Sequence, residues 1–172
     1  MSATLRSATR DDIATLSAVA VDCFNETFGH MYRPEDLAAH HAAKNSVAYF
    51  TAAFDAGDSL YLVEQDGHAI GYGKLGHVEV PVKPRPAAGG VEIHRVYIRA
   101  SHQGKGHGRT LLLHMLADAR VQHAPVLYLG VWQENLKAQA LYTQYGFKIV
   151  GEYLYPVGQH MDHEFIMARV RG

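Results

Sequence analysis

The chain has 172 residues, 48% of them hydrophobic, and 16 basic and 17 acidic residues leave a formal net charge of −1. This length and composition predict a single domain over residues 1–172 with a sizeable core. The near-neutral charge argues against nucleic acid or an anionic membrane as the main partner, because both attract basic surfaces. The single cysteine, Cys23, excludes an internal disulfide, favours a reducing compartment and is expected in the core.

The first residues, MSATLRSATRDD, lack the pattern of a secretory signal, and no apolar run approaches the roughly 20 residues that span a bilayer. We therefore expect a cytoplasmic protein without a membrane partner. The 12 histidines are scattered, and the tightest group runs from His160 to His163. Alternating side chains on a late strand are the favoured interpretation of that group, and we expect no metal; a metal site is the alternative.

The first third of the chain predicts a short strand at 4–9 and then three helices, over residues 13–28, 34–44 and 46–57. Asp11 or Asp12 is the expected N-cap of the first helix. Pro34 suits the first turn of the second helix. Ser46 is expected to cap the third helix, and Gly57 to end it.

The middle of the chain predicts a β-hairpin, because Asp66-Gly67 between two apolar strands suits a type I′ turn. A stiff, proline-containing loop follows at 79–90, and then a strand at 91–98. The remainder alternates between helices and strands: a helix to about Val121, a strand at 125–132, a helix at 136–145 ended by Gly146, and strands at 147–155 and 164–170. This order predicts an α/β (α+β) fold with helices on both faces of a mixed sheet.

The stretch SHQGKGHGRTLL, Ser101 to Leu112, places three glycines directly before a helix. The first amides of a helix lack intrahelical partners and lie at its positive end. Glycines let an anion approach those amides closely. We therefore interpret the loop as a phosphate cradle, with a solvated turn as the alternative. Its residues are Gln103, Gly104, Lys105, Gly106, His107, Gly108 and Arg109.

The segment QGKGHG fits Q/R-x-x-G-x-G/A, the acetyl-CoA pyrophosphate motif of the GNAT superfamily of N-acetyltransferases. EIHRVYIRASHQGKGHGRTLL resembles the central strand and cofactor loop of that family, and VWQENLKAQALYTQYGF resembles its second hallmark. The resemblance covers nearly the whole chain. It implies a single-domain GNAT fold whose mixed, mostly antiparallel central sheet is flanked by helices on both faces.

The resemblance further implies acetyl-CoA as co-substrate and direct transfer of its acetyl group to a primary amine in a ternary complex. In the family, the central strand splays from its neighbour, and its free amides hold the pantetheine arm. Matching by position implies that the Val96 amide polarises the acetyl carbonyl. It also implies that Tyr97 and Ile98 hold the pantetheine arm.

An alkyl ammonium with a pKa of about 10.4 is neutral in only about one molecule in 10³ at pH 7, so amine acetylation benefits from a base. Strand alternation predicts that Glu92, His94, Val96 and Ile98 share one face. Glu92 is the leading candidate base, because it matches the glutamate base of histone-type members of the family. His94 is the alternative, and a purely structural or substrate-binding role remains open for Glu92.

Tyr142 is the candidate general acid, because the second hallmark of the family places a tyrosine there. Asn135 lies two helical turns before it on the same face, and we expect it to cap the helix and to contact the pantetheine arm. A buried aromatic role for Tyr142 is the alternative. Tyr145, one turn on, is expected to pack. A solvated role is favoured for Lys137 over a contact with the 3′-phosphate of the cofactor.

The acceptor is expected to bind between the first two helices, the hairpin and the late strands. NETFGHMYRPEDL, from Asn25 to Leu37, resembles the same region of PaiA-type spermidine/spermine acetyltransferases, which favours a polyamine-like small molecule. Protein N-termini, lysines, amino acids and aminoglycosides remain open as acceptors. The charges of a polyamine would be met by carboxylates, for which the candidates are Glu26, Glu35, Asp36 and Asp162. For Glu35 and Asp36, the favourable first turn of a helix is the simpler interpretation.

Two alternatives to an enzyme remain at this level. The first is a non-catalytic, regulatory acyl-CoA-binding module on the same fold, and the second is a metal-binding protein built on the histidines. The sequence leaves the choice between monomer and homodimer open.

Overall fold

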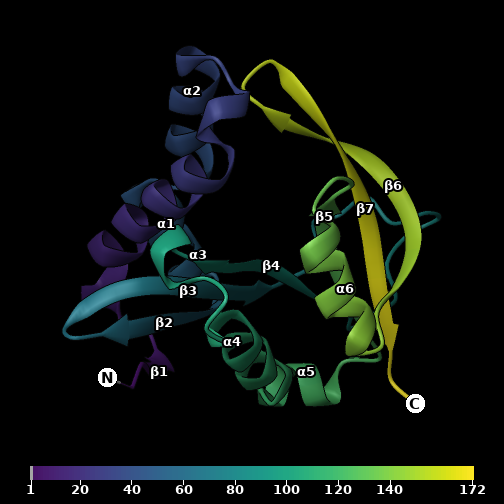
Figure 1. Cartoon of the computed structure of the whole chain (residues 1–172). Coiled ribbons are helices and arrows are strands. Elements are labelled where there is room, and N and C mark those ends of the chain that lie inside the picture. The colour runs from purple at the N-terminus through teal and green to yellow at the C-terminus, as the bar shows by residue number, and fades with distance from the viewer. Residues whose placement is uncertain (1) are drawn as a thin grey trace.

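The computed structural model describes residues 2–172 and shows one seven-stranded sheet in the order β1-β2-β3-β4-β5-β7-β6 (Figure 1). Every neighbouring pair is antiparallel except β4 and β5, so the predicted mixed, mostly antiparallel sheet is confirmed. The strands are β1 (Thr4–Ser7), β2 (Ser59–Gln65), β3 (His68–Gly76), β4 (Val91–Ile98), β5 (Val126–Trp132), β6 (Lys148–Val157) and β7 (His160–Val170).

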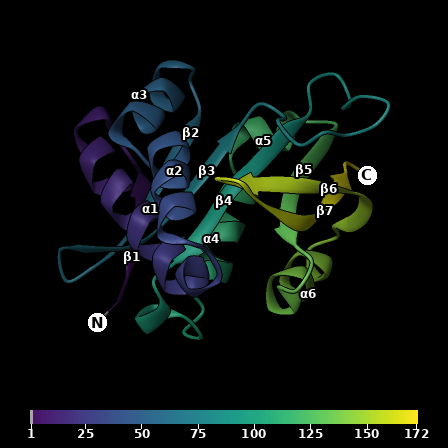
Figure 2. The same ribbon diagram turned by 90° about the horizontal axis from the view of Figure 1, so that it is seen from above.

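Helices cover both faces of the sheet, as predicted. They are α1 (Ile13–Phe28), α2 (Pro34–Lys44), α3 (Val47–Asp55), α4 (His107–Leu116), α5 (Ala119–His123) and α6 (Leu136–Gln144). Along β2, Leu60 and Leu62 pack with α1 and α3, whereas Tyr61 and Val63 pack with α4. Figure 2 shows α1, α2 and α3 gathered over the β1–β4 half of the molecule, with α6 beside the β5–β7 half. In the described residues, no helix has the length and apolar character of a membrane span.

Local signals place several element boundaries as predicted. The Ser46 hydroxyl accepts a hydrogen bond from the Tyr49 amide at 3.2 Å and so caps α3. Asp66 and Gly67 both adopt positive φ, 54° and 78°, as a type I′ turn requires. Gly146 follows α6 with φ 89°. In each case the signal involves residues no more than a few positions apart.

Three details at the ends of elements differ from prediction. Asp12 precedes α1, but its carboxylate binds Arg6 at 2.8 Å and the Thr9 amide at 2.7 Å instead of capping that helix. The helix expected to reach Val121 ends at Leu116, and Asp118 starts α5 by accepting from the Arg120 amide at 2.8 Å. β7 begins at residue 160, so His160 to His163 are strand residues, as the favoured interpretation held.

β4 and β5 pair over only three residues of each strand. Their register joins Val91–Ile93 to Leu127–Leu129, after which β5 continues alongside β7 while β4 continues alongside β3. From His94 onward, the edge of β4 that faced β5 is therefore open. This divergence is the splay that the family resemblance implied.

A β-bulge lies in β4 at the same point. The register with β3 shifts between Lys74 and Leu75, and the shift leaves His94 as an extra residue in β4. A bulge of this kind reverses the alternation of side chains beyond it.

The bulge makes the predicted face assignment wrong. Three β4 residues pack in the core on the α4 side: Ile93, Val96 and Ile98. Tyr97 packs on the opposite side with α1, and Arg95 precedes it by two residues in regular pairing. Glu92, adjacent to Ile93, also faces away from α4. Glu92 therefore shares a face with Arg95 and Tyr97, and not with Val96 and Ile98.

Candidate functional site

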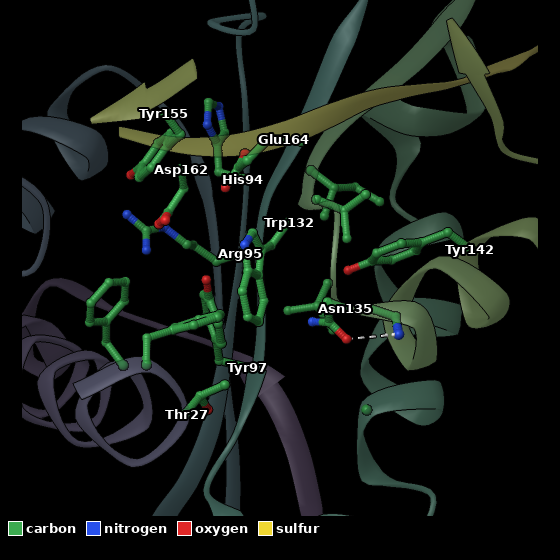
Figure 3. Close-up of a pocket in the computed structure, with 18 of the residues that line it drawn as sticks. Thr27, His94, Arg95, Tyr97, Trp132, Asn135, Tyr142, Tyr155, Asp162 and Glu164 are labelled. Carbon is green, nitrogen blue, oxygen red and sulfur yellow. Dashed lines mark hydrogen bonds between the residues drawn. The ribbon is translucent and has the colours of Figure 1, made fainter. Parts of the chain in front are cut away.

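A cavity of about 1030 Å³ opens where β4 and β5 diverge (Figure 3). All of β4 from Glu92 to Ile98 contributes to its wall. One end reaches the glycine loop before α4 and the inner side of α6. The other end lies between α1 and the long β6–β7 hairpin. A single continuous space therefore joins most of the residues that the sequence predicted.

The glycine loop at one end of the cavity has a backbone that only glycine adopts readily. Gly104 and Gly106 have φ of 76° and 87°, and Gly106 is the residue directly before α4. The Gln103 side chain donates to the Ile98 carbonyl at 2.9 Å and ties the loop to the end of β4. Five loop residues line the cavity: Gln103, Gly104, Gly106, Gly108 and Arg109.

Two residues of the predicted cradle do not line the cavity. Lys105 is exposed, and its ammonium donates to the Ser101 carbonyl at 3.1 Å. His107 is the first residue of α4. By contrast, Arg109 donates to the Gln144 side chain at 3.2 Å and so connects α4 with α6 beside the cavity.

Glu92 is a buried carboxyl group at the point where the two strands part. It is 5% exposed, and its Oε2 accepts hydrogen bonds from the amides of Glu79 and Val80, at 2.6 and 2.9 Å. Burial raises the pKa of Glu92 to about 7, although the two amides oppose the shift. Glu92 therefore exchanges its proton close to neutral pH.

His94 lies beside Glu92 and is neutral near pH 7. Burial lowers the pKa of His94 to about 3. Its Nε2 lies 2.9 Å from the His77 carbonyl oxygen, which fixes the proton on Nε2 because a carbonyl only accepts. Its Nδ1 is 3.5 Å from Glu92 Oε1, so an unprotonated nitrogen faces the carboxyl group.

Tyr142 and Asn135 both line the cavity from α6, and Figure 3 shows the Tyr142 hydroxyl directed toward its interior. Burial raises the pKa of Tyr142, so its phenol keeps its proton. Asn135 Oδ1 accepts from the Ala138 amide at 3.1 Å and caps α6, as predicted. Tyr145 packs against the core, also as predicted. Lys137, for which a solvated role was favoured, also lines the cavity.

The opposite end of the cavity is rich in aromatic side chains. Phe24, Thr27 and Phe28 come from α1, and further rings come from the α1–α2 connection, α3, β5 and β6: Tyr32, Tyr49, Trp132, Tyr153 and Tyr155. Two carboxylates of β7 face this space, each bound to a tyrosine hydroxyl. Asp162 accepts from Tyr32, and Glu164 accepts from Tyr153 at 2.6 Å.

Most of the carboxylates proposed for the acceptor pocket lie elsewhere; of the four, only Asp162 lines the cavity. Glu26 accepts from the Ala100 amide at 2.7 Å, and Asp36 binds Arg33 and the Gln159 amide, both at 2.9 Å. Glu35 lies 3.5 Å from Arg33. The β2–β3 hairpin was also expected in this wall, but its described residues contribute nothing to the lining.

Sequence reasoning did not select several cavity residues: Arg95, Trp132, Tyr153, Tyr155 and Glu164. The spacing of Tyr153 and Tyr155 in a predicted strand indicates a shared face. Which face it is depends on pairing with β7. For Arg95, the β4 bulge decides the direction of the side chain, and the sequence carries no evident signal of that bulge.

The remaining candidates lie outside the cavity or form no cluster. Cys23 lies on α1, is 1% exposed and packs in the core, as predicted. His160 contacts Asp162 at 3.1 Å. Between residues 2 and 172, no three His, Cys, Asp or Glu side chains are grouped as they would be around a metal ion.

Comparisons with known proteins agree with this geometry. The Acetyltransferase (GNAT) family model matches residues 19–147. An uncharacterized N-acetyltransferase of Lactobacillus delbrueckii subsp. lactis is 28% identical over 159 residues, covering 92% of this chain and 91% of that protein. An L-methionine sulfoximine/L-methionine sulfone acetyltransferase of Pseudomonas paraeruginosa is 31% identical over 155 residues, covering 88% and 84%.

The fold also matches a solved structure, the PaiA N-acetyltransferase of Thermoplasma acidophilum in complex with coenzyme A. The TM-score is 0.76 at 21% identity, and the match covers 99% of this chain and 100% of the other. Because the family model matches residues 19–147, the chain belongs to the GNAT family of acetyltransferases.

Proposed function

We propose that this enzyme transfers the acetyl group of acetyl-CoA to the primary amine of a small molecule, by direct attack in a ternary complex. The observation that carries the proposal is the continuous cavity, which joins the glycine loop to Glu92 and Tyr142. Acetyl-CoA would supply the activated acetyl group as a thioester.

The glycine loop fits the pyrophosphate of the co-substrate. Gly104 and Gly106 hold a positive-φ backbone in which added side chains would lie in open space, so the approach to the α4 amides is unobstructed. The open edge of β4 at Val96, Tyr97 and Ile98 would hold the pantetheine arm beside Asn135. A backbone amide aimed at a developing oxyanion typically contributes about 3 kcal/mol to lowering a barrier.

Glu92 is the proposed base. A base works best with a pKa near the operating pH, and Glu92 meets this condition with its pKa of about 7. His94, with its pKa lowered to about 3, is a much weaker base at pH 7. Glu92 would take a proton from the acceptor ammonium, directly or through a water molecule. The neutral nitrogen then attacks the thioester carbon.

Tyr142 is the proposed acid. As the carbon–sulfur bond breaks, its phenol would donate a proton to the leaving thiolate. Burial holds the phenol in its protonated form before transfer. Tyr142 lies on α6, across the cavity from β4 (Figure 3). The proposed base and the proposed acid therefore lie on different walls of the cavity.

The polyamine acceptor stays a prediction that the cavity supports only in part. Asp162 and Glu164 offer negative charge at the acceptor end, but Glu26, Glu35 and Asp36 do not. The Pseudomonas relative acts, by its name, on amino acid derivatives. We therefore define the acceptor class as a small primary amine and treat polyamines and amino acids as separate arms of the test.

The test is release of free coenzyme A thiol from acetyl-CoA with a panel containing spermidine, free amino acids and a lysine peptide. We expect release above the hydrolysis background with one class of amine. If no amine exceeds the background while acetyl-CoA still raises the melting temperature, the proposal fails and the non-catalytic acyl-CoA-binding module replaces it.

A further inference from the structure

Arg95 is a buried cation on the wall of the cavity. Arg95 is 7% exposed, and the bulge in β4 places its side chain on the same face as Glu92. Across residues 2–172, no carboxylate oxygen forms an ion pair with its guanidinium within 4.0 Å. A buried charge without a counterion is costly, so its position calls for an explanation.

The tyrosines around Arg95 do not neutralise it. Its guanidinium lies 5.8 Å from the centre of the Tyr97 ring, and three more tyrosines are close: Tyr49, Tyr72 and Tyr155. Burial raises the pKa of Tyr72 and Tyr97, and that of Tyr155 to about 12. These phenols are therefore uncharged near pH 7 and supply polar or aromatic contacts without negative charge.

The two nearby carboxylates of β7 bind other side chains and form no ion pair with Arg95 within 4.0 Å, although the charge of Arg95 opposes the burial that raises the pKa of Glu164. Asp162 accepts from Tyr32 and contacts His160 at 3.1 Å, and Glu164 accepts from Tyr153. Figure 3 shows the guanidinium of Arg95 extending toward Tyr155 and Asp162 and away from Tyr142. It therefore points into the acceptor end of the cavity.

A second buried cation in the same sheet shows the alternative arrangement. Lys74, the β3 partner of Arg95, is 1% exposed and forms an ion pair with Asp58 at 2.9 Å. Lys74 does not line the cavity, whereas Arg95 does. The buried cation that serves structure thus has an internal counterion, and the one that faces the site has none.

We infer that Arg95 binds a carboxylate of the acceptor, so that the acceptor is an amine carrying a carboxylate, of which free amino acids are the simplest class. The planar guanidinium fork matches a carboxylate through two parallel hydrogen bonds. Because Glu92 and Arg95 share a face of β4, one group serves the ammonium and the other the carboxylate of the same molecule. The inference rests on the proposed function and narrows the acceptor class from small primary amines to those that carry a carboxylate.

The test uses sets of matched acceptors: several amino acids, their carboxamides and the corresponding decarboxylated amines. We expect the wild-type kcat/KM for at least one amino acid to exceed that for its two counterparts without a carboxylate by about 100-fold. Arg95→Gln should reduce this ratio to within a few-fold of one. It should do so mainly by raising the KM for the amino acid, while turnover of the amines without a carboxylate persists.

Two controls accompany the variant. Arg10→Gln removes a positive charge from an exposed residue outside the cavity and should leave the ratio unchanged. Acetyl-CoA should raise the melting temperature of Arg95→Gln as it does that of the wild type, which shows that the variant folds. If the variant does not fold, the wild-type ratios decide alone.

Two results would overturn the inference. One is a set of wild-type ratios all near or below one. The other is an Arg95→Gln variant that slows amines with and without a carboxylate equally. Either result leaves acetyl transfer to an amine intact. Absence of thiol release with every amine is different, because it overturns the proposed function and this inference together.

Discussion

Glu92 and His94 are neighbours in space, and burial shifts their pKa values in opposite directions. Removal from water disfavours the charged form of each, which raises the pKa of the acid to about 7 and lowers that of the base to about 3. Near and below pH 7, Glu92 is therefore the member of the pair that holds a proton. Such a pair assigns proton acceptance near neutral pH to the carboxyl group, with His94 as its neutral neighbour.

Replacing Glu92 with Gln should lower kcat/KM by about 10²- to 10⁴-fold, because the variant loses its general base. The wild-type profile should rise with pH through about 7 as Glu92 loses its proton. In the variant, only the rise in kcat/KM that follows deprotonation of the amine itself should remain. The measurement is kcat/KM from pH 5.5 to 9 for both proteins with one acceptor.

Glu164→Gln is the matched comparison for that experiment. Glu164 also lines the cavity, and burial also raises its pKa. If Glu164→Gln removes the rise of kcat/KM near pH 7 and Glu92→Gln keeps that rise, the assignment of the base to Glu92 is wrong.

Replacing Tyr142 with Phe should lower kcat by about 10²-fold and leave binding of acetyl-CoA nearly unchanged, because the ring remains and only the proton donor is lost. Tyr145→Phe makes the same change one turn on, at a residue that packs against the core, and should have little effect. Single-turnover rates and acetyl-CoA titrations separate the two quantities. Equal activity of the two variants would remove Tyr142 from the chemistry.

At the scale of elements, the start of α4 depends on backbone conformation more than on side chains. Gly106→Ala would place a Cβ in open space, but the backbone would have to keep a φ of 87°. That strain is on the order of 1 kcal/mol. Relief of the strain would move the first amides of α4, so we expect the KM for acetyl-CoA to rise several-fold.

Gly57→Ala is the control for strain alone. Gly57 has a φ of 80°, and its added Cβ also meets nothing within 4 Å. Gly57 does not line the cavity, so this variant should lose similar stability without a change in KM for acetyl-CoA. A parallel rise in KM for both variants would show that the loop acts only through global stability.

The bulge in β4 is the second element that shapes the site. One extra residue, His94, shifts the pairing with β3 and turns Arg95 and Tyr97 to the face that carries Glu92. Parallel pairing with β5 also ends at Ile93, directly before this point. The two irregularities together create an open strand edge and a wall that carries both an acid and a cation.

At the scale of the whole molecule, Glu92 links folding to pH. Its pKa is near 4.5 when unperturbed and about 7 in the folded protein, so the folded chain holds an extra proton between these values. The stabilisation is complete below about pH 4.5 and is lost as pH rises through 7. The free energy of unfolding of the wild type, relative to Glu92→Gln, should therefore fall by about 3 kcal/mol between pH 4.5 and 8.

Urea unfolding of both proteins at several pH values measures this difference. Subtracting the variant removes the contributions of other titrating groups, such as His40, whose pKa burial lowers to about 3. A difference that stays constant with pH, or one that grows in favour of the wild type above pH 7, would contradict the burial of a protonated Glu92.

Local sequence determined most of the elements and the positions of the two family hallmarks. The Ser46 and Asn135 caps and the Asp66-Gly67 turn depend on contacts within three residues, so their residue types predict them directly. The glycine loop is equally local, because a positive φ next to a helix start is a property of glycine itself. The family motifs then located Glu92 and Tyr142, both of which line the cavity.

Only the tertiary structure decided which charged residues line the cavity. Glu26 is bound to an amide 74 residues away and Asp36 to one 123 residues away, so neither is available to the cavity. Arg95 faces the cavity because a register shift against β3 turns it there. Among the described residues it forms no ion pair, whereas Lys74 beside it pairs with Asp58. These outcomes depend on pairing between distant segments, and no short stretch of sequence encodes such pairing.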